Sequence, residues 1–169
     1  RGDLAGAEQD LRRLLALVKQ SQGDAHPDLI TVMWPLAWVL RQQGNATEAR
    51  DRYQRVLHDE PQSLEALLGL ARMDQLAGRN AEAEQGFRKA LKASPNNTQV
   101  IDALGQFYTG QEKWPQAIDV LKQGLQLAPT DDTIRFHLAV ATARSGDLAT
   151  AKPLFVNSVG EAEAEYNLG

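Results

Sequence analysis

The sequence lacks cysteine and lacks any long hydrophobic run. The absence of cysteine excludes disulfides, thiolate metal sites and cysteine nucleophiles, but it does not identify a cellular compartment. No stretch reaches the roughly 18–20 apolar residues that a membrane-spanning helix needs, so we expect no membrane insertion. The sequence therefore predicts a soluble chain and leaves the choice between cytoplasm and periplasm open.

An excess of positive charge is also missing. The 169 residues include 18 basic and 22 acidic side chains, which gives a formal net charge of −4. No general field attracts nucleic acid or an anionic membrane surface, so we expect neither as a partner. The apolar content of 43% is enough for a buried core, and a single domain is the default expectation at this length.

Catalytic and metal-binding patterns are absent as well. The histidines His26, His58 and His137 have no paired spacing, and the sequence contains no phosphate-binding glycine loop, nucleophile elbow or calcium loop. We interpret Asp131 and Asp132 as a turn with a helix N-cap rather than as a metal or acid–base site. His137 is interpreted as a packed or solvated side chain. The sequence therefore predicts no cofactor, no metal and no enzyme activity.

The strongest signal in the sequence is a repeat with a period of 34 residues. Five kinds of position recur in phase: an alanine, a large apolar residue four positions later, a proline, a leucine followed by a small residue, and a glycine five positions before the alanine. In that order they are Ala49, Ala83, Ala117 and Ala151; Tyr53, Phe87, Leu121 and Phe155; Pro61, Pro95 and Pro129; Leu36-Ala37, Leu70-Ala71, Leu104-Gly105 and Leu138-Ala139; and Gly44, Gly78 and Gly146. Agreement of five kinds of position in one phase excludes a chance pattern.

Each repeat is predicted to be a pair of antiparallel helices. Met33, Leu36, Ala37 and Leu40 follow the i, i+3, i+4, i+7 spacing of one helix face. The recurring alanines let two helices approach closely, the large apolar residues fill the space beside them, and the glycines suit helix C-termini. The prolines close each second helix. Because one pair cannot bury its own apolar face, neighbouring pairs are expected to stack.

These residues resemble the tetratricopeptide repeat (TPR), a helix–turn–helix unit of 34 residues. The resemblance implies an all-α fold, a right-handed superhelical solenoid of antiparallel helix pairs, in one domain spanning 1–169. Full repeats are expected at 30–63, 64–97, 98–131 and 132–160, with a half repeat at 1–29 and a truncated repeat at 161–169. The incomplete end repeats and the Ala-, Gln- and Arg-rich composition predict a fragment of a larger bacterial protein.

Some positions depart from the family pattern. The spacing from Ala7 to Ala49 is 42 residues, which resembles the longer repeats of the kinesin-light-chain type with their extended helices. Glu112 stands where a glycine is expected, and we expect Gly110 to supply that turn instead. Pro35 lies inside a predicted helix, as does a second proline in the last complete pair, and both are expected to kink their helices.

The resemblance places ligand binding in a concave groove lined by the first helix of each pair. The candidate groove residues are Thr31, Trp34, Trp38, Arg41, Leu68, Arg72, Gln75, Asp102, Gln106, Phe136 and Val140, and the same register adds Glu65, Gln99, Thr109, Thr133 and Ala143. One TPR class grips the acidic C-terminus of chaperones with a clamp of Lys, Asn and Arg. Here the corresponding positions hold Trp34, Trp38 and Leu68, with Arg72 alone in its repeat, which argues against a chaperone co-factor role.

Trp34 and Trp38 lie one helical turn apart and allow two interpretations. They are either anchors for an apolar side chain of a bound peptide or helix, or they pack against the leading half repeat. The second interpretation follows from Val32, Pro35 and Val39, which make the same helix apolar on its other sides. The sequence leaves both interpretations open.

The leading functional hypothesis is a non-catalytic scaffold that binds a peptide or helix of a protein partner in the groove. The alternative is a substrate-presenting module of a larger enzyme, or a self-assembly module of a bacterial pilus or secretion assembly protein. Leu11, Leu14 and Leu15 at one end and Tyr166 and Leu168 at the other are expected to be uncovered. Terminal repeats normally need a polar cap, so we expect end-to-end homo-oligomers.

Overall fold

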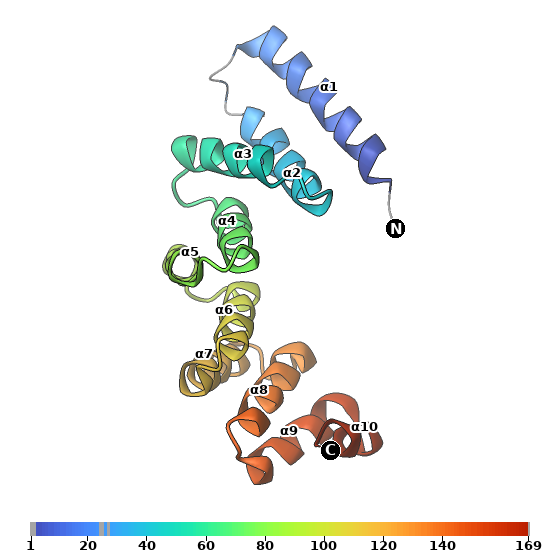
Figure 1. The fold of residues 1–169 in the computed structure, drawn as a ribbon, viewed down its shortest axis with the longest axis vertical. Helices are drawn as coiled ribbons and strands as arrows, with labels where there is room; N and C mark the ends of the chain where they lie inside the picture. Colours follow the sequence, from blue (N-terminus) through green and yellow to red (C-terminus); the bar gives the residue numbers. More distant parts are fainter. Residues whose placement is uncertain (1–2, 24–25, 27, 169) are drawn as a thin grey trace. The chain divides into compact units, whose positions relative to one another are not determined.

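The computed structural model of the chain describes residues 3–23, 26 and 28–168, with the side chains of residues 161, 162 and 168 left undescribed. Within this part of the chain every regular element is an α-helix, which confirms the predicted all-α class. In chain order (Figure 1) the helices are α1 Leu4–Gln22, α2 Asp28–Gln42, α3 Ala46–Asp59, α4 Leu64–Leu76, α5 Asn80–Ala93, α6 Thr98–Gly110, α7 Trp114–Leu127, α8 Asp132–Arg144, α9 Leu148–Val159 and α10 Glu161–Leu168.

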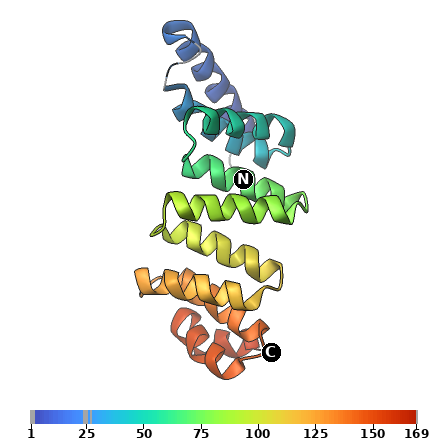
Figure 2. The same cartoon turned by 90° about the vertical axis from the view of Figure 1, so that its left-hand side faces the viewer.

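The chain divides into two compact units, Arg1–Ala90 and Leu91–Gly169. In the first unit α1 packs on α2, α2 on α3 and α3 on α4; in the second unit α6 packs on α7, α7 on α8, α8 on α9 and α9 on α10. The first helices of neighbouring pairs also touch, because α2 contacts α4 and α6 contacts α8. Each unit is therefore a stack of consecutive helix pairs (Figure 2), as the repeat pattern predicts.

The alternation of small and large residues forms the core of each pair. Ala37, Ala49, Ala71 and Ala83 are completely buried, as the repeat pattern predicts, and so are the large residues that follow the second-helix alanines. At Gly86 on α5 the helices approach so closely that an added Cβ would lie 2.9 Å from the Cβ of Ala71 on α4. Close approach buries apolar surface without leaving cavities, which is what holds the pair together.

Helix starts follow the same period. α4, α6 and α8 begin at Leu64, Thr98 and Asp132, which are 34 residues apart. The carboxylate of Asp131 caps α8 by accepting hydrogen bonds from the backbone N–H groups of Thr133 (3.0 Å) and Ile134 (3.1 Å). The interpretation of Asp131 as a helix N-cap is confirmed.

The turn at Glu112 differs from the expectation. Glu112 itself takes the left-handed backbone conformation (φ 56°), as Gly44, Gly78 and Gly146 do in the other pairs, whereas Gly110 is the last residue of α6. At this helix end, as at the others, the backbone N–H of the residue after the turn donates a hydrogen bond to the carbonyl five residues earlier. These hydrogen bonds fix the backbone conformation of the turn residue. The glutamate therefore has to accept a conformation that glycine adopts without strain.

The N-terminal helix is longer than the helices that follow it. α1 has 19 residues, against 12 to 15 in α2 to α9, so an extended helix accounts for part of the 42-residue spacing between Ala7 and Ala49. α1 is also better covered than expected. Leu15 is buried and Leu11 packs partly against the same core, because α2 and α3 lie against this side of α1. Leu14 remains exposed, as expected.

The two helices that contain an internal proline continue through it. α2 runs through Pro35 and α9 through Pro153, and the kinks remain predictions. α9 ends at Gly160, which has a φ of 90°, and α10 follows directly within the segment predicted to be a truncated repeat. No helix in the described ranges is long and apolar enough to cross a membrane.

Candidate functional site

The exposed side of α2 and α4 carries most of the candidate residues of the first unit. We call this surface the α2–α4 face and define it by six of the predicted groove residues, which are Trp34, Trp38, Arg41, Leu68, Arg72 and Gln75. None of the six is fully buried, and Thr31 and Glu65 at the edge are exposed. Because α2 and α4 contact each other, side chains from two successive repeats are brought together on one surface.

Two indole rings form the apolar part of this face. Trp34 is 37% exposed and Trp38 is 42% exposed, whereas Val32 and Val39 on the same helix are buried. The core that joins α1 and α2 contains Leu15 and Val32 and neither tryptophan. Both tryptophans are thus covered over more than half of their surface, and both retain surface that a partner can cover.

Two arginines form the charged part of the α2–α4 face. Arg41 lies in the last turn of α2 and is half-buried, with its Nε atom buried and lacking a hydrogen-bond acceptor in the described structure. Arg72 lies on α4 and is exposed. Burial raises the pKa of the Tyr53 hydroxyl, and the positive charges of Arg41 and Arg72 lower it in part.

In the second unit, the candidate residues Asp102 and Gln106 of α6 form a polar cluster with His137 of α8, which was not a groove candidate. The carboxylate of Asp102 accepts a hydrogen bond from Nε2 of Gln106 (2.7 Å) and lies 2.5 Å from Nδ1 of His137. Asp102 and His137 are both half-buried. The pairing orients the imidazole and joins the two first helices, so His137 has a packing role, in line with its interpretation from the sequence.

The other two candidates on α8 are partly built into the core. Phe136 meets the buried ring of Phe155 edge-on at a centroid distance of 5.6 Å and lies 5.9 Å from the ring of His137. Val140 packs against the same cluster. These two side chains stabilise the α8–α9 pair and leave only part of their surface free.

The sequence interpretation missed two of these relationships. The pairing of Asp102 with His137 joins positions 35 residues apart, and the period of 34 already brings such positions next to each other on adjacent helices. The effect of Arg41 on Tyr53 could have been suspected because Tyr53 is the only large apolar repeat residue that carries a hydroxyl group. The first of these relationships can be predicted once positions one period apart are taken to lie on adjacent helices.

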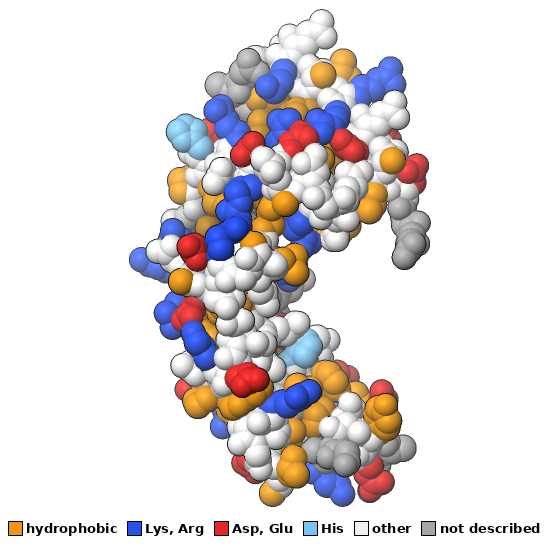
Figure 3. Space-filling view, in the orientation of Figure 1, with side chains coloured by type: hydrophobic (Ala, Val, Ile, Leu, Met, Phe, Trp, Pro, Cys, Tyr) orange, Lys and Arg blue, Asp and Glu red, His pale blue; other side chains and the backbone are white. Residues whose placement is uncertain are grey.

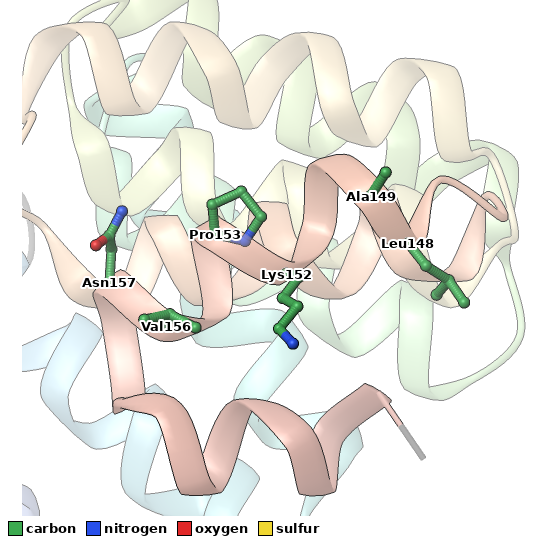
Figure 4. Close-up of a pocket in the computed structure, with 6 residues that line it drawn as sticks. All are labelled: Leu148, Ala149, Lys152, Pro153, Val156 and Asn157. Carbon is green, nitrogen blue, oxygen red and sulfur yellow. The ribbon is translucent and has the colours of Figure 1, made fainter.

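A second surface, on the outer side of α9, was not singled out from the sequence. It contains an open cavity of about 630 Å³, and Figure 4 shows the lining residues Leu148, Ala149, Lys152, Pro153, Val156 and Asn157 along one helix. Two repeats earlier the equivalents of Lys152 and Val156 are Glu84 and Arg88, which form an ion pair (2.9 Å). Apolar side chains also gather over the α8–α10 end of the face shown in Figure 3.

No cluster of three or more histidine, aspartate or glutamate side chains that could hold a metal occurs among the described residues. The histidines are separated: His137 pairs with Asp102, while His26 lies near Asp28 at the start of α2.

The stacked helix pairs and the exposed first-helix surfaces define a helical-repeat protein of the interaction-domain class. Three models of the tetratricopeptide repeat match the sequence, over residues 1–58, 40–107 and 100–134. The chain belongs to the tetratricopeptide repeat family. This confirms the resemblance seen in the 34-residue pattern.

Curated relatives are longer proteins that share these repeats. Cellulose synthase operon protein C of Komagataeibacter sucrofermentans is 30% identical over 117 residues, which are 66% of this chain and 9% of that protein. The type IV pilus assembly protein PilF of Pseudomonas aeruginosa is 27% identical over 120 residues, which are 70% of this chain and 48% of that protein. The chain therefore spans from about a tenth to about half of the length of these two relatives.

Solved structures show the same fold at low sequence identity. A crystal structure of MamA has a TM-score of 0.74 at 16% identity and covers 98% of this chain and 92% of that chain. YrrB, described as a TPR protein with an unusual peptide-binding site, has a TM-score of 0.70 at 22% identity and covers 90% of this chain and 78% of that chain. At this level of sequence identity the likenesses show the TPR fold.

Proposed function

We propose that this chain is a non-catalytic protein-interaction module that binds a peptide or helix of a partner protein on the α2–α4 face. The observation that carries the proposal is the exposure of Trp34 and Trp38 one turn apart on a helix that is otherwise largely buried. Large aromatic side chains that become desolvated on binding are the residues that most often dominate an interface. The proposal makes the two tryptophans anchors for an apolar side chain of the partner.

The remaining positions of the predicted groove extend this surface. Leu68 and Gln75 are half-buried on α4, and Thr31 is exposed on α2. In the second unit Asp102, Gln106, Phe136 and Val140 remain partly accessible, and we propose them as partner contacts of that unit by itself. Support comes from the family, since YrrB is itself described as having a peptide-binding site.

A second proposal concerns the setting of the module. We propose that the chain is part of a larger bacterial assembly protein, and the likeness to PilF and to cellulose synthase operon protein C favours this. A substrate-presenting module of a larger enzyme is the alternative. In both settings the α2–α4 face has to bind a partner, so this binding can be tested before the setting is known.

The test uses the double variant Trp34→Ala/Trp38→Ala. Peptides are selected from a random displayed library on the unmodified chain, and their affinities are measured by fluorescence anisotropy for the chain and the variant. One anchor typically carries about 2 kcal/mol or more, and about 1.4 kcal/mol corresponds to tenfold in affinity. We expect the double variant to bind at least about tenfold more weakly, with its melting temperature little changed.

A matched control removes an exposed apolar side chain elsewhere. Leu127→Ala on α7 does so in the second unit, and it should leave peptide affinity unchanged. An unchanged affinity of the tryptophan variant would contradict the proposal. So would a large loss of thermal stability, because the tryptophans would then be core residues whose removal creates cavities.

A further inference from the structure

A cavity among α1, α2 and α3 carries a further inference, and its lining shares no residue with the α2–α4 face. The cavity has a volume of about 410 Å³, and the described residues that line it are Lys19 of α1, Met33 of α2, and Arg52 and Arg55 of α3. Three of these four side chains are positively charged. Small-molecule sites usually have volumes of about 300–1,000 Å³, so the cavity is large enough for a small anionic ligand.

The contact between α1 and α3 explains why the positive charges meet. Each of these helices forms an antiparallel hairpin with α2, so α1 and α3 run in the same direction. Arg12 on α1 donates hydrogen bonds to both carboxylate oxygens of Glu48 on α3 (2.8 and 2.6 Å). Lys19 follows Arg12 by seven residues, and Arg55 follows Glu48 by seven residues, which is about two helical turns. The alignment that joins Arg12 to Glu48 therefore brings a lysine and an arginine to the same cavity.

Two features of the first repeat build this cavity. Lys19 lies on the extra length of α1, because α3 ends ten residues after Ala49, whereas α1 ends fifteen residues after the equivalent Ala7. Arg52 is a charged residue at a position that is small or apolar in the following pairs. The equivalents of Arg52 are Gly86, Val120 and Leu154. The helix extension and the arginine together make the charged cavity a property of the first pair.

Both arginines keep N–H donors for a ligand. Nη2 of Arg52 pairs with Oε1 of Glu48 (3.1 Å), and Nε of Arg55 pairs with Oδ2 of Asp59 (3.3 Å). A guanidinium has five N–H donors, so each ion pair leaves other N–H groups of the same side chain for a bound anion. The described lining of the cavity includes no carboxylate. An anionic ligand would therefore supply the negative charge that this lining lacks.

We propose that the cavity binds an organic phosphate monoester, with the phosphate group among the three cations and the organic part against Met33. A phosphate monoester carries a charge of about −1.5 to −2 at pH 7 and three acceptor oxygens, which suits three cationic donors better than a single carboxylate does. Met33 is almost completely buried, and its thioether gives the cavity an apolar wall that a bare phosphate ion would not use. A free small molecule and a phosphorylated side chain of another protein share this chemistry.

The experiment uses phenyl phosphate as the probe. Its affinity for the unmodified chain is measured by isothermal titration calorimetry at about pH 8, where the ester is a dianion. Lys19→Gln and Arg55→Gln each remove one cation, and both residues are exposed, so the core stays intact. We expect each variant to bind phenyl phosphate about tenfold more weakly, because a charge-assisted hydrogen bond is lost. Thermal denaturation of both variants verifies that they fold.

Lys89→Gln is the matched control. Lys89 has on α5 the position that Arg55 has on α3, one period later, and it is also exposed. Its replacement removes the same charge away from the cavity and should leave the affinity unchanged. Two further probes separate the parts of the ligand. Phenol lacks the charge and should not bind, and inorganic phosphate lacks the organic part and should bind about tenfold more weakly than phenyl phosphate.

A loss of affinity in both cavity variants, with Lys89→Gln unchanged, supports the proposal. Equal losses in all three variants would show attraction by general surface charge, and the cavity would not be the site. The proposal is also wrong if phenyl phosphate does not bind, or if inorganic phosphate binds as tightly as the ester.

N-acetylphosphotyrosine amide, which carries the same ester on a peptide backbone, distinguishes the two ligand sources. If the site is confirmed, tighter binding than that of phenyl phosphate assigns it to a phosphorylated protein, and weaker binding assigns it to a free small molecule. These variants leave the α2–α4 face unchanged. A failure of the phosphate proposal is therefore distinguishable from a failure of peptide binding on that face.

Discussion

The aromatic ring of Tyr53 on α3 lies against the backbone of Gly69 on α4, in the space that any other residue at position 69 would fill with its side chain. A Cβ added to Gly69 would lie 2.6 Å from Cε1 of the ring. The glycine thus leaves room for the buried tyrosine ring between α3 and α4. A core contact between two repeats therefore depends on the absence of a side chain at position 69.

Replacement of Gly69 by alanine tests this contact. Alanine favours a helix over glycine by about 1 kcal/mol, but overpacking against a buried ring costs about 1–3 kcal/mol. We expect Gly69→Ala to lower the free energy of unfolding by about 1 kcal/mol in urea denaturation. Gly110→Ala is the control, because a Cβ there meets nothing within 4 Å and should be neutral or stabilising. A stabilised Gly69→Ala protein would show that the ring moves away without cost.

The burial of neighbouring residues on α2 predicts different stability effects. Leu36 has no exposed surface, so Leu36→Ala should cost about 2–5 kcal/mol through lost burial and a cavity. Trp38 keeps 42% of its surface exposed, and Trp38→Ala should cost clearly less than Leu36→Ala. Urea denaturation of the two variants measures the difference. Equal losses would contradict the surface position of Trp38.

The bridge between Arg12 and Glu48 predicts a pH effect on the docking of α1. Arg12 donates hydrogen bonds to both carboxylate oxygens of Glu48 (2.8 and 2.6 Å), and this lowers the pKa of Glu48 from 4.5. A lowered pKa in the folded state means that the stabilisation is complete above about pH 4.5 and is lost as the pH falls through the folded-state pKa. The pair is partly exposed, so its contribution at neutral pH is about 1 kcal/mol or less.

Denaturation at about pH 7 and about pH 3.5 checks this effect. Glu48→Gln should be less stable than the unmodified chain at the higher pH and nearly equal to it at the lower pH. Glu82→Gln removes an exposed acid that forms no ion pair in the described structure and serves as the control. A constant difference between Glu48→Gln and the unmodified chain at both pH values would contradict the assignment.

Exposed leucines on α1 predict self-association. Leu14 and Leu17 lie three residues apart on one face of α1 and are 46% and 56% exposed, and Tyr166 near the other end is also exposed. An uncovered apolar face of a terminal helix favours contact with another copy. We expect light scattering to show oligomers at high protein concentration, and Leu14→Glu/Leu17→Glu to shift them toward the monomer. A monodisperse monomer of the unmodified chain at high concentration would refute this prediction.

The repeat itself could be read from the sequence. The 34-residue period located the helix pairs, the alanines and large apolar residues of the core, and the cap at Asp131, because close helix packing restricts residue size at fixed positions. The positions of the first helices also followed from the period, which is why the candidate residues such as Trp34 and Arg72 lie at the surface in the structure. Contacts within a repeat and between adjacent repeats recur because the residues that form them recur in the sequence.

Other features were decided by tertiary structure, because they depend on which atoms of different helices meet. The sequence allowed Trp34 and Trp38 to be core or surface, and in the structure both side chains keep more than a third of their surface exposed. Glu112 had to take the left-handed conformation because the hydrogen bonds of the helix end fix that position. The position of the buried Tyr53 ring depends on the space left open at Gly69. A period gives the register of the helices, but the contacts between particular side chains depend on the volume and charge of each residue.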